Sequence, residues 1–134
     1  MDKKKYYKIL FLIGGIYNLI GAFLLGILPI FVDGLLPFFG IANPDSLLFV
    51  HIFTAIITGV SVGYFILFKD ITKNHALIIV GAIGRAVTFI LALIYLILGD
   101  CNWIFLLLLS PDILQATLYV EFLVNYKKLE IDSP

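Results

Sequence analysis

The sequence predicts an all-α integral membrane protein: a four-helix transmembrane bundle with its N- and C-termini in the cytoplasm. Three observations support this fold class: the composition, four long apolar stretches, and lysines confined to one predicted side. Of the 134 residues, 62% are hydrophobic and 13% are charged, whereas soluble domains contain about 45–50% apolar and about 25% charged residues. We expect the whole chain, 1–134, to form a single transmembrane domain.

The four apolar stretches approach the roughly 20 residues that a helix needs to cross about 30 Å of hydrocarbon. They cover approximately residues 9–30, 47–68, 76–98 and 103–126. Glycine, proline, asparagine and aspartate are frequent between them, which is typical of turns. The alternation of polar and apolar residues that marks a transmembrane barrel is absent from the sequence. Helices, which satisfy their own backbone hydrogen bonds, are therefore expected.

The N-terminus has a basic start and an apolar run, as a signal peptide does. The run is longer than a usual signal-peptide core, and no small-x-small cleavage site follows it. We expect it to be retained as the first transmembrane helix.

The lysines gather before the first span, between the second and third spans, and after the fourth. They are Lys3, Lys4, Lys5, Lys8, Lys69, Lys73, Lys127 and Lys128. The other two connections contain no lysine or arginine. The positive-inside rule then predicts cytoplasmic termini and a multi-pass protein of the cytoplasmic membrane. The same bias argues against dual-topology four-span transporters and fluoride channels.

Two features of the sequence leave alternatives open. The first outward connection contains "LLPFFGI", which we interpret as a short re-entrant or surface helix, or as a loop packed over the bundle. Glycines recur in the first three spans, including a GxxxG at Gly59 and Gly63. Small residues allow close helix packing, within the chain or between two copies, and we favour contacts within the chain.

Three polar residues lie at similar predicted depth. Arg85, Asp112 and Asn18 each lie nine residues from the start of a span, about 13–14 Å at 1.5 Å per residue. Thr58 comes within a turn of that level. These residues predict an inward-facing polar layer near the middle of the membrane.

Arg85 and Asp112 are expected to pair. Charged groups in a membrane are costly and usually face the bundle interior as pairs. A very short connection makes the third and fourth spans antiparallel neighbours, and the arginine fork suits a carboxylate. Pro111 removes the amide that would bond the Leu107 carbonyl, so Arg85 could also donate to that carbonyl.

Further polar residues extend the polar layer along the faces of the second and fourth spans. Gln115 and Tyr119 follow Asp112 along one side of the fourth span, and His51 shares a face with Thr58 on the second. Three interpretations remain: a buried ion pair that fixes helix register, a polar cavity opening outward past His51, or a surface that meets another subunit. His51 could equally be a helix-packing residue. The candidate ligand-binding or polar-layer residues are Asn18, His51, Thr58, Arg85, Asp112, Gln115 and Tyr119.

Catalytic patterns are not found. His51 and His75 fall on opposite predicted sides, and Cys101 has no cysteine partner. No nucleophile elbow or phosphate-binding glycine loop occurs. The lysine clusters are short and juxtamembrane, which indicates contact with anionic lipid and not with nucleic acid. We expect no catalytic residue, no metal site and no cofactor, and therefore no enzyme.

Several segments resemble an uncharacterised family of small four-span bacterial membrane proteins, distantly DoxX-like. They are "GIYNLIGA", "GVSVGYFILFKDITKNHALIIVGAIGR", "GDCNW" and "SPDILQ", with Phe122 near the end of the fourth span. In that pattern the position of Arg85 is more often lysine. The resemblance implies a fold and a set of positions, and no activity.

The sequence therefore favours a non-enzymatic integral membrane module: an accessory or assembly subunit, or a small-ligand binder, with a buried polar layer. The alternative is a small transporter or channel in which Arg85 and Asp112 bind an anion or relay protons. The lipid bilayer is the expected partner, and other membrane subunits or further copies of the chain are candidates.

Overall fold

The computed structural model describes residues 3–131, with side chains as far as residue 126. Within this part of the chain there is no strand. The four long helices are α1 (Lys3–Ala22), α3 (Leu48–Lys69), α4 (His75–Leu98) and α5 (Trp103–Ile131). Each is part of a segment long and apolar enough to cross a membrane. The predicted all-α fold with four spans is confirmed.

The helices differ from the predicted spans mainly at the two ends of the chain. α1 begins at Lys3, within the basic segment, because lysine and tyrosine continue a helix at little cost. Beyond Ala22 the helix widens into a π-helical turn, η1 (Phe23–Ile27), and then tightens into a 3₁₀ turn, η2 (Leu28–Ile30), which contains Pro29. α5 continues to Ile131.

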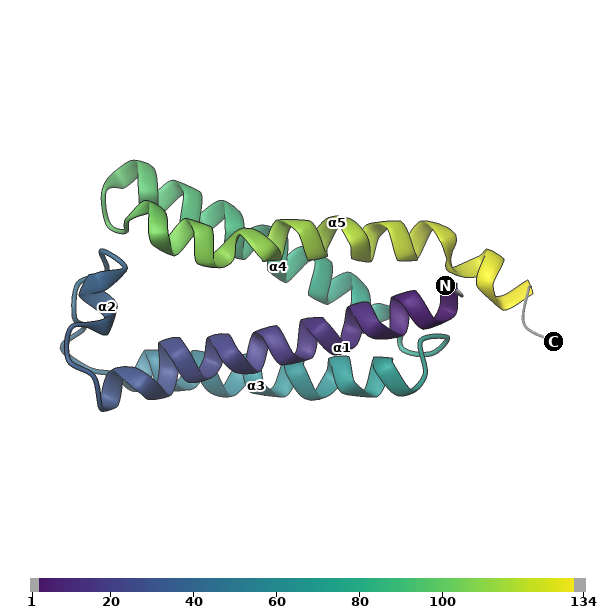
Figure 1. Cartoon of the computed structure of the whole chain (residues 1–134), viewed down its shortest axis with the longest axis horizontal. Helices are drawn as coiled ribbons and strands as arrows, with labels where there is room; N and C mark the ends of the chain where they lie inside the picture. Colours follow the sequence, from purple (N-terminus) through teal and green to yellow (C-terminus); the bar gives the residue numbers. More distant parts are fainter. Residues whose placement is uncertain (1–2, 132–134) are drawn as a thin grey trace.

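The four helices form two antiparallel pairs (Figure 1). α1 packs along α3 in the first pair, and α4 packs along α5 in the second. Only a short length of α1 contacts α5. The α4–α5 turn is tight because Gly99 adopts a left-handed conformation, with φ of 85°, which lets the next amides bond back to the last carbonyls of α4. The predicted antiparallel contact of the third and fourth spans is confirmed.

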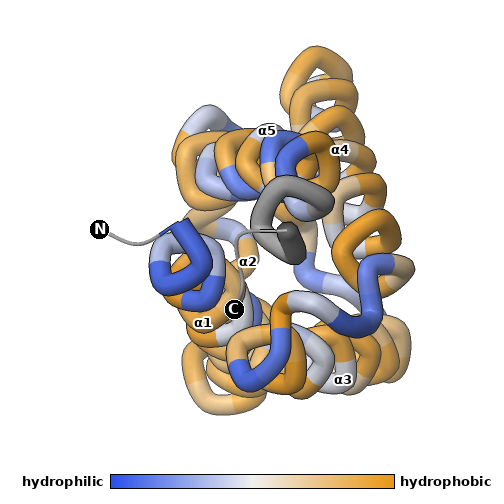
Figure 2. The backbone as a smooth tube through the Cα atoms, turned by 90° about the vertical axis from the view of Figure 1, so that its right-hand side faces the viewer, coloured by the Kyte–Doolittle hydropathy of each residue, from blue (hydrophilic) through white to orange (hydrophobic). Residues whose placement is uncertain are grey.

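The start of α1 and the end of α5 lie at the same end of the molecule, here called the terminal end (Figure 1). Hydrophilic residues gather there in α1 and in the α3–α4 loop, whereas the helices are apolar along most of their length (Figure 2). In that loop, hydrogen bonds from the Thr72 hydroxyl and amide, together with Lys73, lower the pKa of Asp70 to about 2.

An aromatic core joins the two pairs toward the terminal end. Phe11 of α1 packs on Tyr119 and Phe122 of α5, with ring centroids 5.2 and 5.4 Å apart, and all three are buried. Tyr64 of α3 reaches the same core, 5.5 Å from Tyr119. Burial of these large rings supplies much of the contact between the pairs.

Glu121 lies at the edge of this core. Its carboxylate accepts a hydrogen bond of 3.0 Å from the Tyr7 hydroxyl. The Tyr7 contact links α1 to α5 in addition to the aromatic packing.

The first connection contains one helical turn, α2 (Leu35–Phe38), at the end opposite the termini (Figure 1). Leu36 and Phe39 are buried, whereas Phe38 is exposed. The expected short helix is therefore present, and it lies at this end of the bundle.

The glycines divide into two groups by what an added Cβ atom would meet. Five glycines within helices face other helices at contact distance: Gly14, Gly15, Gly26, Gly63 and Gly81. Three glycines within helices have no neighbour within 4 Å: Gly21, Gly59 and Gly84. The predicted packing of small residues within the chain therefore holds for the first group, and the GxxxG of α3 uses only its second glycine.

Gly26→Ala is expected to destabilise the fold. A Cβ atom there would lie 1.8 Å from Oγ1 and 2.7 Å from Cβ of Thr54, so the end of α1 would have to move away from α3. Overpacking of this kind costs about 1–3 kcal/mol. Thermal unfolding in mild detergent should show a lower midpoint. Gly21→Ala, which meets nothing within 4 Å, is the matched control, and equal midpoints for the two variants would contradict the packing described.

Candidate functional site

Arg85 and Asp112 form a buried ion pair between α4 and α5. Each lies close to the middle of its helix, and each is only 5% exposed. Nη1 of Arg85 donates a hydrogen bond to Oδ1 of Asp112. The predicted pairing is confirmed, and its cause is that neither charge could be buried at acceptable cost without the other.

The guanidinium of Arg85 also reaches the first helix pair. Its Nη2 donates to the carbonyl oxygen of Gly14 at 3.2 Å and to Oδ1 of Asn18 at 2.9 Å. Both acceptors lie on α1, one turn apart. Arg85 therefore connects α5, α4 and α1 through a single side chain, and it joins the two helix pairs near mid-height.

Three tyrosine rings surround the guanidinium. Its central carbon lies 5.2 Å from the ring centroid of Tyr64, 5.5 Å from that of Tyr17 and 5.6 Å from that of Tyr119. A cation over an aromatic face is stabilised by about 0.5–2 kcal/mol, with the larger values at desolvated sites. We name this group the Arg85 cluster; its members are Gly14, Tyr17, Asn18, Tyr64, Arg85, Asp112, Gln115 and Tyr119.

Glycine at position 14 is required by the closeness of this packing. A Cβ atom there would lie 2.3 Å from the Tyr119 hydroxyl oxygen, 2.9 Å from Oε1 of Gln115 and 3.3 Å from Nη2 of Arg85. The α1 backbone thus approaches the cluster closely enough for its carbonyl to accept from Arg85. A larger residue would push α1 away and lengthen that bond.

The carbonyls near Pro111 are satisfied differently from the expectation. The Leu107 carbonyl, freed by Pro111, accepts from the Ser110 hydroxyl at 2.8 Å and not from Arg85. Tyr17 of α1 instead donates to the Leu108 carbonyl at 2.8 Å. Because Ser110 satisfies the freed carbonyl locally, α5 continues through Pro111 as one helix, and the Tyr17 bond adds a second link between α1 and α5.

Four more of the predicted residues can now be placed. Gln115 and Tyr119 are buried on α5, on the terminal-end side of Asp112. The Tyr119 hydroxyl donates to Oε1 of Gln115 at 3.4 Å. Thr58 does not join them: it is exposed, and its hydroxyl bonds the Thr54 carbonyl of its own helix. His51 is also exposed. The structure therefore brings together Asn18, Arg85, Asp112, Gln115 and Tyr119 and leaves His51 and Thr58 on the surface.

Depth alone led to the misplacement of Thr58. Its level in the span matches that of the cluster, but α3 turns Ser61 and Tyr64 inward and the face of Thr58 outward. Tyr17 and Tyr64 are the members that the sequence reasoning missed. Their signal was a tyrosine inside an apolar span, where a hydroxyl needs a partner.

One nitrogen atom of the Arg85 cluster has no hydrogen-bond partner among the described residues. It is Nε of Arg85, which is buried. Buried polar atoms are nearly always paired, so such an atom calls for an explanation, such as an ordered water, an ion or a ligand. For metals there is no comparable indication, since no group of three His, Cys, Asp or Glu side chains occurs within the described part of the chain.

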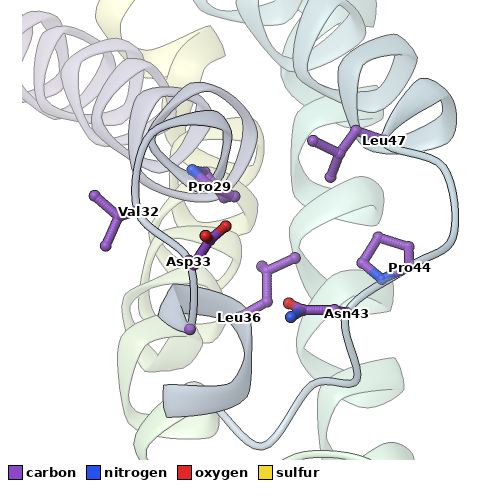
Figure 3. Close-up of a pocket in the computed structure, with 8 residues that line it drawn as sticks. Pro29, Val32, Asp33, Leu36, Asn43, Pro44 and Leu47 are labelled. Carbon is purple, nitrogen blue, oxygen red and sulfur yellow. The ribbon is translucent and has the colours of Figure 1, made fainter.

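A separate cavity lies at the end opposite the termini, between η2, α2 and the segment that leads into α3. Its volume is about 220 Å³. The side chains of Asp33, Leu36 and Asn43 point into it, while Val32 points away (Figure 3). The cavity is open to the surface and lies outside the Arg85 cluster.

Breaking the ion pair from one side should destabilise the protein more than removing it whole. Arg85→Met or Asp112→Leu alone leaves a buried charge without its partner, which costs about 3–5 kcal/mol. The double variant leaves neither charge and should recover most of that loss. A double-mutant cycle on thermal unfolding measures the coupling, and strictly additive effects of the two substitutions would contradict the pairing.

The comparisons with known proteins give no match. No protein-family model, no curated protein and no solved structure matches this chain. The resemblance to small four-span, distantly DoxX-like membrane proteins stays a prediction, and the function is argued from the Arg85 cluster itself.

Proposed function

We propose that this chain is a non-enzymatic, multi-pass protein of the cytoplasmic membrane that binds a small molecule at the Arg85 cluster. The observation that carries this proposal is the buried Nε of Arg85, which has no partner among the described residues. The proposed orientation, with the terminal end in the cytoplasm, rests on the one-sided lysines.

The chemistry of the unused donor limits the ligand. The guanidinium has five N–H donors, and its contacts with Asp112, Gly14 and Asn18 use three of them. Nε is the guanidinium nitrogen that has no partner among the described residues, so its N–H is free for an acceptor. The ion pair is already neutral, so a neutral ligand with a carbonyl or similar oxygen would add no net charge to the site. Asn18, which is half-buried, forms the accessible edge at which such a ligand would enter.

A second candidate is a small transporter or channel. The Arg85–Asp112 pair favours it, because the pair lies near the middle of α4 and α5, and Arg85 also bonds Asn18 of the other helix pair. In many transporters the substrate site has this position, and one half of the protein moves against the other around it. Arg85 would then hold an anion, or Asp112 would exchange a proton.

The proposed orientation predicts a labelling pattern for introduced cysteines. In a Cys101→Ser background, Asn43→Cys should react with a membrane-impermeant maleimide in intact cells. Lys73→Cys, in the α3–α4 loop, should react only after permeabilisation. Both positions are exposed, so reactivity reports the side of the membrane. The opposite pattern would overturn the orientation.

The proposed ligand predicts a bound mass. Native mass spectrometry of the full chain, extracted from membranes in mild detergent, should detect a non-protein molecule that is lost in Arg85→Lys. Lysine keeps the positive charge but lacks Nε and the planar fork. Thr58→Ala, at an exposed position of α3, is the control and should retain the molecule.

Other results of the same preparation would count against ligand binding. A mass that Arg85→Lys retains, or no bound mass in the wild-type protein, contradicts it. Flux in proteoliposomes that disappears in a folded Asp112→Asn variant would support the transporter. A co-purifying membrane protein without a bound molecule or flux would indicate an assembly subunit.

A further inference from the structure

A strap crosses the end of the molecule opposite the termini. It comprises residues 34–40, in which the single turn of α2 lies between Gly34 and Gly40. These glycines have φ of 88° and 75°, a left-handed backbone conformation that residues other than glycine rarely adopt. In Figure 1 the strap lies between the first and second helix pairs at this end.

Asn102, in the α4–α5 turn, holds the strap. Its backbone amide donates to the Phe39 carbonyl at 2.9 Å, and its Nδ2 donates to the Phe38 carbonyl at 2.7 Å. Its Oδ1 accepts from the amides of Ile104 and Phe105 at the start of α5. One side chain therefore caps α5 and binds the strap, with separate atoms for the two tasks.

Packing supports these hydrogen bonds. Phe39 is 5% exposed and its ring centroid lies 6.0 Å from that of Phe105. A Cβ atom at Gly40 would lie 2.7 Å from the Asn102 nitrogen, so the strap backbone rests directly on the turn. Cys101, in the same turn, is only 7% exposed. We call this contact of Phe38, Phe39 and Gly40 with Asn102 and Phe105 the latch.

The rest of the strap is less tightly held. Pro37 and the side chain of Phe38 are exposed, whereas Leu36 is buried and lines the cavity beside the strap. On the side of the first helix pair, the strap forms one wall of the cavity of about 220 Å³, so it is not closely packed there (Figure 3). A short segment that borders a cavity, is held to the second helix pair by one hydrogen-bonded contact and is flanked by glycines is the kind that opens at low free-energy cost.

We propose that the strap is a lid: it pivots at Gly34 and Gly40, and release of the latch lets the two helix pairs part at this end. The pairs are joined toward the terminal end by the aromatic core, so separation at the strap end is the motion that the packing permits. Asn18 lies one turn closer to the strap than Gly14 and is half-buried, whereas Gly14 is buried. The further step, that the lid admits a ligand to the Arg85 cluster, rests on the proposed function. The opening of the latch does not depend on it.

The only cysteine of the sequence, Cys101, is buried beside Asn102 in the α4–α5 turn, with its thiol 3.7 Å from the Ala92 carbonyl. If the latch opens, labelling of this thiol is expected to become faster. The experiment is the rate of maleimide labelling of the full chain in nanodiscs, where both faces are accessible, at one fixed pH. Asn102→Asp keeps the oxygen that caps α5 and replaces the Nδ2 donor with an oxygen that repels the Phe38 carbonyl. It should raise the labelling rate about tenfold, in line with loss of one or two hydrogen bonds.

A variant on the strap separates lid opening from a local change in the turn. Phe39→Ala alters no residue of the turn, and it should also raise the labelling rate of Cys101. Phe31→Ala, at a side chain before the strap that is 77% exposed, is its matched control and should leave the rate unchanged. Thermal unfolding of all three variants establishes that each is folded during labelling.

The outcomes are distinct. Faster labelling in Asn102→Asp and Phe39→Ala, with Phe31→Ala unchanged, supports the lid. An increase in Asn102→Asp alone places the effect in the turn and overturns the proposal, as does no increase in either variant. If labelling behaves as expected but native mass spectrometry detects no bound molecule, the lid stands and the ligand-binding function fails.

Discussion

The arrangement of this protein depends on burial of one guanidinium group among apolar helices. A charge in such surroundings must be neutralised and its donors must be occupied. Asp112 supplies the opposite charge, and the Gly14 carbonyl and Asn18 supply further acceptors. Because these acceptors lie on α5 and α1, the hydrogen bonds of Arg85 fix which residues of α5 and α1 lie level with it. Three tyrosine rings complete the enclosure.

The other contacts between the pairs extend this arrangement toward the two ends. At the terminal end, aromatic rings fill the space between α1, α3 and α5. At the opposite end, side-chain packing between the pairs is replaced by a strap held through backbone carbonyls and Asn102. The two helix pairs are therefore joined by aromatic packing at the terminal end, by the hydrogen bonds of Arg85 in the middle, and by the latch alone at the opposite end. This gradient gives a direction to any opening motion.

Much of the fold was predictable from the sequence because the membrane restricts the possible structures. Span lengths follow from bilayer thickness, and the very short connection at Gly99 makes α4 and α5 neighbours. The Arg85–Asp112 pair followed from charge, depth and that neighbour relation. Thr58 was misplaced because depth specifies the level of a residue but not the face of its helix. The latch was not foreseen, since it depends on backbone carbonyls of the strap, which leave no mark on the sequence pattern.

The location of the two charges within one hairpin has a consequence for biogenesis. Between Ile9 and Ile30, and between Leu48 and Phe68, the first two spans contain no Asp, Glu, Lys or Arg, so the first helix pair can enter the bilayer without help. At the level of the Arg85 cluster, α4 and α5 carry opposite charges that neutralise each other, so the second pair can enter with this ion pair already formed. Docking of the halves then brings the Gly14 carbonyl and Asn18 to further donors of Arg85, and the Tyr7 hydroxyl to the carboxylate of Glu121.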